Sequence, residues 1–270
     1  MKVGALVVIF LVGVMAMFVV RRINGQRAAR RRYLLGMKFD HSVRHELARD
    51  FAIYGMLPDG LKDELDGLVH VFVEEKAFEA CGGLEEVSGH MQRVIGAQAC
   101  LMLLRIEHDF YEKLRTVLVY PGAYKAEGMD GSGDSVRLGE SWGSGSVVLS
   151  WESVLSGGRD PKDGHDVSIH EFSHQLDQKD GAGDGVPVLD SRGAYREWAG
   201  VFRPAFEKLQ ARAEKGKTKV LDDYGAENPA EFFAVATETF YEKPKQLAKA
   251  YPKVFEALQG YYGVDPRDWK

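Results

Sequence analysis

The segment Ile169-His170-Glu171-Phe172-Ser173-His174 constrains this chain more than any other feature of its sequence. On a helix, His170 and His174 are four residues apart and share one face, so two imidazole nitrogens can reach one tetrahedral Zn²⁺. Glu171 then projects beside them, towards a metal-bound water, which is the HExxH pattern of metallopeptidases. A structural alternative is a helix capping box formed by Ser168 with Glu171, with His170 as a core histidine.

Two histidines need a third protein ligand to close a zinc site. No histidine follows His174, which excludes the extended three-histidine pattern and leaves a carboxylate. Residues 224–234 supply one near the start of a predicted helix. Glu231 also fits the third position of a helix with Asn228 as N-cap and Pro229 at the first position, where a glutamate has a capping role. The candidate ligands in this region are Glu227, Glu231, Glu238 and Glu242.

The N-terminus differs from the rest of the chain. Residues 3–20 form a run of 18 apolar or small residues, which as a helix is about 27 Å long and close to a bilayer core of about 30 Å. We therefore expect one N-terminal transmembrane helix, with a cleaved signal peptide or a buried core helix as the alternatives. Six arginines follow between residues 21 and 32. They predict a single pass through the cytoplasmic (inner) membrane, with the following domain in the cytoplasm.

Composition narrows the class of the remaining chain. Of the 270 residues, 45% are apolar and 28% are charged, which is a globular composition that excludes disorder. The net charge of -5 argues against direct nucleic-acid binding, because phosphate contacts need a basic face. Two cysteines, Cys81 and Cys100, are too few for a disulfide framework or a cysteine-rich metal site. We expect residues 1–35 to be the membrane anchor with its basic flank and residues 36–270 to be one catalytic domain.

Hydrophobic periodicity predicts a mainly helical α+β domain with a small sheet. Strands are expected over residues 116–120 and 146–151, the second being either a core strand or a strand that holds an extended peptide. Residues 124–145 are rich in glycine and serine and indicate a surface loop, and residues 157–164 indicate a polar connection. Helices are expected over residues 40–54, 58–78, 90–104, 167–177, 191–215, 229–241 and 245–259.

Several motifs occur together in this sequence: VVLSW at residues 147–151, HEFSHQLD at 170–177 and NPAEFFA at 228–234. This combination is far more specific than HExxH alone. With the Asp-Gly pairs at 180–181 and 184–185, these motifs closely resemble the Mlc titration factor A family of zinc peptidases. The likeness covers roughly residues 57–258 and extends to the catalytic domain of lethal-factor-type toxins.

The resemblance implies a zincin-like fold of the gluzincin type. It implies one Zn²⁺ on His170, His174 and Glu231, with Glu171 as general base and Tyr224 as a possible hydrogen-bond donor to the oxyanion. It also implies aminopeptidase-type activity on small peptides and binding of a glucose-responsive transcriptional repressor. The alternative function is therefore a regulatory protein that binds a repressor, with hydrolysis secondary.

Two further residues have open roles. A tyrosine hydroxyl stabilises an oxyanion without carrying charge, but Tyr224 could also be a packing aromatic. Asp177, three residues after His174, could orient a ligand imidazole or lie in water at the helix end.

Overall fold

The computed structural model describes residues 2–126, 135–137, 139–142 and 145–270, with side chains for residues 13–123 and 145–270. The α-helices are α1 (Lys2–Leu35), α2 (His41–Asp50), α3 (Ala52–Met56), α4 (Asp59–Glu75), α5 (Gly89–Leu101), α6 (Trp151–Arg159), α7 (Val167–Asp177), α8 (Arg192–Ala213), α9 (Pro229–Glu242), α10 (Pro244–Ala250) and α11 (Pro252–Tyr262). The strands are β1 (Ala77–Ala80), β2 (Thr116–Tyr120), β3 (Tyr124–Ala126), β4 (Ser135–Arg137), β5 (Gly139–Trp142) and β6 (Ser146–Ser150), and two 3-10 turns are η1 (Asp223–Ala226) and η2 (Pro266–Asp268). The predicted mainly helical α+β fold with a small sheet is confirmed.

The main sheet has four strands in the order β1-β2-β6-β5, and β3 pairs separately with β4. β1, β2 and β6 are parallel, whereas β5 runs antiparallel to β6 at one edge. The two expected strands, β2 and β6, lie at the centre of the sheet. Val117 and Val119 of β2 and residues 147–149 of β6 are buried. β1 is too short to show a period, and its first two residues overlap the end of the helix expected over residues 58–78. β5 lies in the glycine-rich segment expected as a loop.

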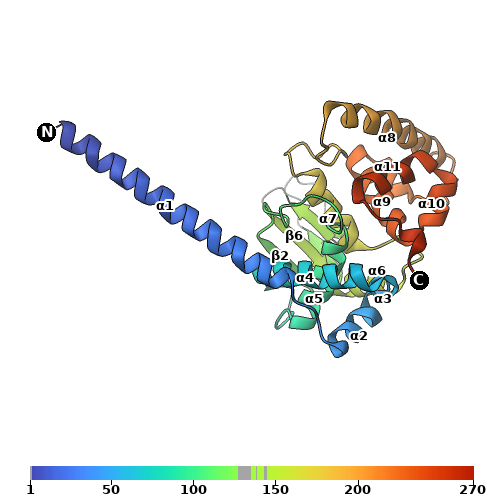
Figure 1. Cartoon of the computed structure of the whole chain (residues 1–270). Helices are drawn as coiled ribbons and strands as arrows, with labels where there is room; N and C mark the ends of the chain where they lie inside the picture. The colour runs from blue at the N-terminus through green and yellow to red at the C-terminus, as the bar shows by residue number, and fades with distance from the viewer. Residues whose placement is uncertain (1, 127–134, 138, 143–144) are drawn as a thin grey trace.

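α7 occupies the middle of the fold. It contacts β5 and β6 as well as α5, α6 and α9, and Figure 1 shows it beside the sheet. Phe172 of α7 is fully buried, and its ring centroid lies 5.6 Å from that of Phe72 and 5.4 Å from that of Tyr111. This aromatic cluster joins α7 to α4 and to the segment before β2.

The C-terminal helices α8 to α11 gather on one side of the molecule (Figure 1). Their contacts are largely aromatic: Trp198 stacks on Phe202 with ring centroids 4.0 Å apart, and Phe240 lies 5.2 Å from Phe255. The single helix expected over residues 245–259 is instead divided into α10 and α11. Pro252 begins the second helix, because a proline has no N–H to continue the first and disfavours helical backbone in the residue before it.

α1 extends away from the rest of the molecule (Figure 1). In the part of the chain that the structure describes, no helix has the length and apolarity needed to cross a membrane. The expected transmembrane helix over residues 3–20, and with it the single-pass membrane location, therefore has no support. The described side chains begin at Gly13, only eight residues before Arg21, whereas a span needs about 20 apolar residues. The side chains of residues 3–12 lie outside the described part.

The end of α1 nearest the domain packs on α4. Arg31 and Arg27 form ion pairs with Glu75 at 2.6 and 2.9 Å, and Leu34 is 4% exposed. The core therefore includes a residue on the N-terminal side of the boundary expected between residues 35 and 36. That boundary stays a prediction.

Candidate metal centre

α7 is fixed in rotation by a buried apolar side and by its N-cap. Asp166 is the N-cap, and its Oδ1 accepts hydrogen bonds from the N–H groups of Ser168 and Ile169 at 2.9 and 3.0 Å. Ile169 and Phe172 are fully buried, which leaves the two histidines on another face of the helix. The capping box of Ser168 with Glu171 is therefore wrong, because Ser168 already lies inside the helix.

α9 begins where the sequence predicts. Asn228 is the N-cap, and its side-chain oxygen accepts a hydrogen bond from the Glu231 N–H at 3.1 Å. Pro229 occupies the first position, where its missing N–H costs nothing. Phe232 and Phe233 are buried and hold the first turn against the core. Glu231 is thus placed so that its carboxylate faces α7.

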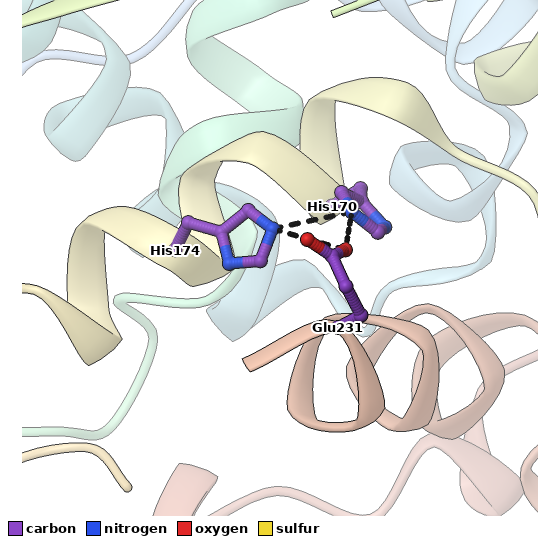
Figure 2. A group of neighbouring side chains, drawn as sticks. All are labelled: His170, His174 and Glu231. Atoms are coloured by element: carbon purple, nitrogen blue, oxygen red, sulfur yellow. Dashed lines mark hydrogen bonds and ion pairs between the residues drawn. The ribbon is translucent and has the colours of Figure 1, made fainter. Parts of the chain in front are cut away.

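The structure brings His170, His174 and Glu231 together, as Figure 2 shows. The Nε2 of His170 lies 2.9 Å from Oε2 of Glu231, and the Nε2 of His174 lies 3.4 Å from the same oxygen. The two Nε2 atoms are 3.2 Å apart. All three side chains are at least four-fifths buried. Glu231 makes these contacts with the imidazoles in addition to the capping contact of its own backbone N–H.

These separations are close to, and in two cases shorter than, those around one small divalent ion. Ligand atoms about 2.0–2.2 Å from a tetrahedral zinc ion lie about 3.3–3.6 Å apart, and the three separations here are 2.9, 3.2 and 3.4 Å. Two imidazoles and one carboxylate also leave a fourth position for water or substrate. Among the described residues, this is the one group of three or more metal-binding side chains with such spacing.

The electrostatics of His170 and Glu231 favour positive charge at this site. Burial disfavours the charged carboxylate of Glu231, but hydrogen bonds from His170 and His174 lower its pKa to about 2. Burial likewise disfavours the charged ring of His170, but Glu238 and Glu231 outweigh it and raise the pKa of the imidazole. The pocket therefore stabilises positive charge between carboxylates, which suits a divalent ion.

Glu238 contacts the ring nitrogen of His170 that does not face Glu231. The Nδ1–H of His170 donates to Oε1 of Glu238 at 2.7 Å, and Oε2 of Glu238 accepts the Asp166 N–H at 2.8 Å. Glu238 is 5% exposed. Glu238 was one of the four candidate ligands, and the structure places it at Nδ1 of His170 and outside the His-His-Glu group. A carboxylate at Nδ1 keeps Nε2 available for an ion.

Two more buried carboxyl groups lie beyond Glu238: Glu242, which was one of the four candidate ligands, and Asp166, which was not a candidate. Burial raises the pKa of Asp166 to about 7 and that of Glu242 to about 10, and the charge of Glu238 adds to both. Oε2 of Glu242 accepts the His165 N–H at 2.9 Å. The spacing of Glu231, Glu238 and Glu242, at intervals of seven and four residues, was the available signal, because it predicts one face of α9.

Glu171 follows His170 and is 7% exposed. Burial raises the pKa of its carboxyl to about 7, and the neighbouring histidines only partly offset this. A carboxyl that gains and loses a proton near neutral pH has the property required of a general acid and base.

Tyr224 and Asp177 have different surroundings. The ring of Tyr224, on η1, lies 5.7 Å from that of His170, measured between centroids, and the side chain is 46% exposed. Tyr224 therefore borders the metal centre. Asp177 is buried, and its Oδ1 accepts the N–H groups of Gly185 and Val186 at 2.8 and 2.9 Å. The alternative in which Asp177 lies in water is therefore wrong. Its described hydrogen bonds hold the loop at residues 185–186.

The expected peptide-holding strand needs a correction. β6 is paired with β2 on one side and with β5 on the other, so its backbone cannot also pair with a substrate. The expectation that residues 146–151 hold an extended peptide is therefore wrong, and the core-strand alternative is right. β5 lies at the edge of the sheet and contacts α7.

The fold is a mainly helical α+β domain, and two of its helices bring His170, His174 and Glu231 together. These two features define the class of metallopeptidase-like domains. The chain belongs to the family described as glucose-regulated metallo-peptidase M90, which matches residues 26–263. Family membership supports a metallopeptidase that acts on peptide or protein substrates and uses a divalent metal ion. It also confirms the resemblance to Mlc titration factor A.

Relatives match over most of their length. An uncharacterised protein of Synechocystis sp. is 37% identical over 221 residues, which is 79% of this chain and 80% of the relative. The protein named Mlc titration factor A of Pectobacterium atrosepticum is 32% identical over 188 residues, or 65% and 69% of the two chains. The protein of the same name from Serratia proteamaculans is 29% identical over 206 residues, or 72% and 76%.

Proposed function

We propose that this chain is a zinc-dependent peptidase in which His170, His174 and Glu231 hold the ion and Glu171 is the general base. One observation supports this most strongly: three ligand atoms from two helices lie within 4.8 Å of one another. The donor set and the spacing suit zinc, and the family supports peptide hydrolysis.

The residues have distinct tasks in this mechanism. A bound zinc ion supplies a Lewis acid that polarises the scissile carbonyl and acidifies a water molecule. Glu171 accepts the proton of the attacking water and returns it to the leaving amine, which its pKa of about 7 permits near neutral pH. Glu238 fixes the orientation of His170 through Nδ1. Tyr224 donates a hydrogen bond to the developing oxyanion.

We further propose that the substrate lies along β5. An edge strand can accept an extended peptide through backbone hydrogen bonds, and β5 is the strand of the main sheet that lies at the edge beside α7. The family resemblance suggests aminopeptidase-type activity. Cleavage of aminoacyl substrates, compared with the same substrates carrying a blocked amino group, tests that mode.

The experiment that tests the proposed function compares Glu171→Gln with the wild-type chain. Glutamine is nearly isosteric, so zinc should stay bound, while hydrolysis of a peptide library should fall by about 100-fold or more because proton transfer is lost. Glu227→Gln, in the segment before α9, is the matched control and should keep both zinc and activity. Activity of Glu171→Gln within a few-fold of wild type at full zinc occupancy would contradict the assignment.

The name Mlc titration factor A, which two of these relatives carry, favours a second candidate function. We propose that the chain also binds a protein partner of the transcriptional repressor class. Glu171→Gln separates the two functions, because it removes the base and leaves the surface nearly unchanged. If the partner binds both proteins and neither hydrolyses peptides, binding is the main function and hydrolysis is secondary.

A further inference from the structure

The segment that carries Tyr224 is held differently at its two ends. At its C-terminal end, η1 packs on α8 and α9: a Cβ on Gly225 would lie 3.1 Å from Cβ of Val235, and the Gln210 Nε2–H donates to Ala226 O at 3.1 Å. These contacts leave little space and fix that end. The N-terminal end, where Tyr224 lies, depends on other contacts.

Leu221, just before η1, is buried, and the side chain of Asp222 provides two further contacts. Its Oδ1 accepts the backbone N–H of Tyr224 at 2.8 Å, which makes Asp222 the N-cap of η1. Its Oδ2 lies 3.6 Å from Nε2 of His165, which is an ion-pair contact when the imidazole is protonated. One carboxylate thus connects the backbone of Tyr224 to the segment that leads into α7.

His165 is itself anchored. Its backbone N–H donates to Oδ1 of Asp163 and to Oε2 of Glu242, both at 2.9 Å, and the next residue, Asp166, caps α7. The position of His165 is therefore tied to the two helices that carry the metal-binding residues. The side chain of His165 is 57% exposed and lies beside the Asp222 carboxylate that caps η1.

We infer that Asp222 is a positioning residue for Tyr224, with His165 as its second anchor. This inference rests on the proposed function, in which the Tyr224 hydroxyl serves the oxyanion. Asp222 does not touch the reacting atoms. It acts by holding the N-terminal end of η1, so that the ring stays 5.7 Å from the ring of His170.

The test uses the full chain and a readout that does not depend on activity. 3-Fluorotyrosine at position 224 reports the surroundings of the ring through its fluorine resonance. Asp222→Ala should shift or broaden this resonance in both zinc-free and zinc-loaded protein. Asp222→Asn keeps an oxygen that accepts the Tyr224 N–H and should restore it, and Asp223→Ala, one residue along, is the matched control that should leave it unchanged.

Kinetics give the second readout. Loss of one capping hydrogen bond should lower kcat about 3- to 30-fold, with KM within about twofold of wild type. In a Tyr224→Phe background Asp222→Ala should add little, because the hydroxyl that it positions is already absent. An unchanged resonance in Asp222→Ala, or losses that simply add in the double variant, would overturn the inference. A shifted resonance with full activity in Tyr224→Phe would keep the positioning role of Asp222 and reject Tyr224 as the donor.

Discussion

Replacing Gly185 with alanine should weaken metal binding, although Gly185 is not a metal ligand. A Cβ at this position would lie 2.2 Å from the carbonyl oxygen of Pro229 and 2.6 Å from its carbonyl carbon. Real Cβ atoms essentially never come within 3.0 Å of another heavy atom, so the loop and α9 must separate by about 0.8 Å, which is the difference between 3.0 and 2.2 Å.

Both sides of this contact are held in place. The N–H groups of Gly185 and Val186 donate to Asp177, and the Trp198 Nε1–H donates to the Gly185 carbonyl at 3.3 Å. These bonds hold the loop, and the buried Phe232 and Phe233 hold the first turn of α9. The displacement is therefore shared, and part of it falls on Pro229, two residues before Glu231. Metal-ligand distances tolerate only about ±0.2 Å. We therefore expect zinc affinity to fall about 10- to 100-fold, the range measured when support around metal ligands is lost.

Gly183→Ala is the matched control. Gly183 and Gly185 both have left-handed backbone, with φ of +61° and +82°, so alanine at either costs about 1–2 kcal/mol of folding free energy. A Cβ on Gly183 meets only Cγ of Gln178, at 3.5 Å. Urea unfolding should show destabilisation of both variants, whereas competition with a chromogenic chelator should show weaker zinc binding for Gly185→Ala alone. Equal zinc affinities in the two variants would refute the reasoning.

Three further changes test other parts of the structure. Hydrogen bonds from Arg31 and Arg27 outweigh burial and lower the pKa of Glu75 from 4.5 to about 2, so these ion pairs contribute stability that is present above pH 4.5 and is lost as the pH falls towards 2. Glu75→Gln should remove that part of an acid titration, whereas Glu74→Gln, whose exposed side chain pairs with the exposed Arg30, should leave stability nearly unchanged. Phe172→Ala should lower the free energy of unfolding by about 3–5 kcal/mol in urea titrations, and a loss below 1 kcal/mol would contradict the buried cluster with Phe72 and Tyr111. Glu238→Gln should weaken zinc binding about 10- to 100-fold in the chelator assay, and unchanged affinity would show that His170 needs no carboxylate at Nδ1.

The sequence predicted the part of the site that depends on a single helix. The i, i+4 spacing of His170 and His174 places both rings on one face whatever surrounds the helix. The third ligand depends on how α9 packs against α7, and spacing alone left four glutamates open. The motif resemblance pointed to Glu231, and the structure turns that carboxylate towards both imidazoles.

The parts of the fold that were missed are set by tertiary pairing. β1 has four residues, and β5 lies in a glycine-rich segment, so neither carries a hydrophobic period, and both exist because a neighbouring strand pairs with them. α6 begins immediately after β6 with Ser150 as N-cap and ends at Arg159, so its last three residues lie in the segment 157–164 that was expected to be a polar connection. The caps that Asp166 and Asp222 form are local. Their contacts with Glu238 and His165 join segments distant in the chain, so those roles could not be predicted from the sequence.

Zinc content measured together with peptide hydrolysis in Glu231→Ala and Glu227→Ala tests the central claim most directly. The wild-type chain, purified with limiting metal, should hold one zinc ion and hydrolyse peptides. Glu231→Ala should lose both, because only two protein ligands remain, and Glu227→Ala should keep both. One tightly bound zinc ion in Glu231→Ala, or its loss in Glu227→Ala, would contradict the account.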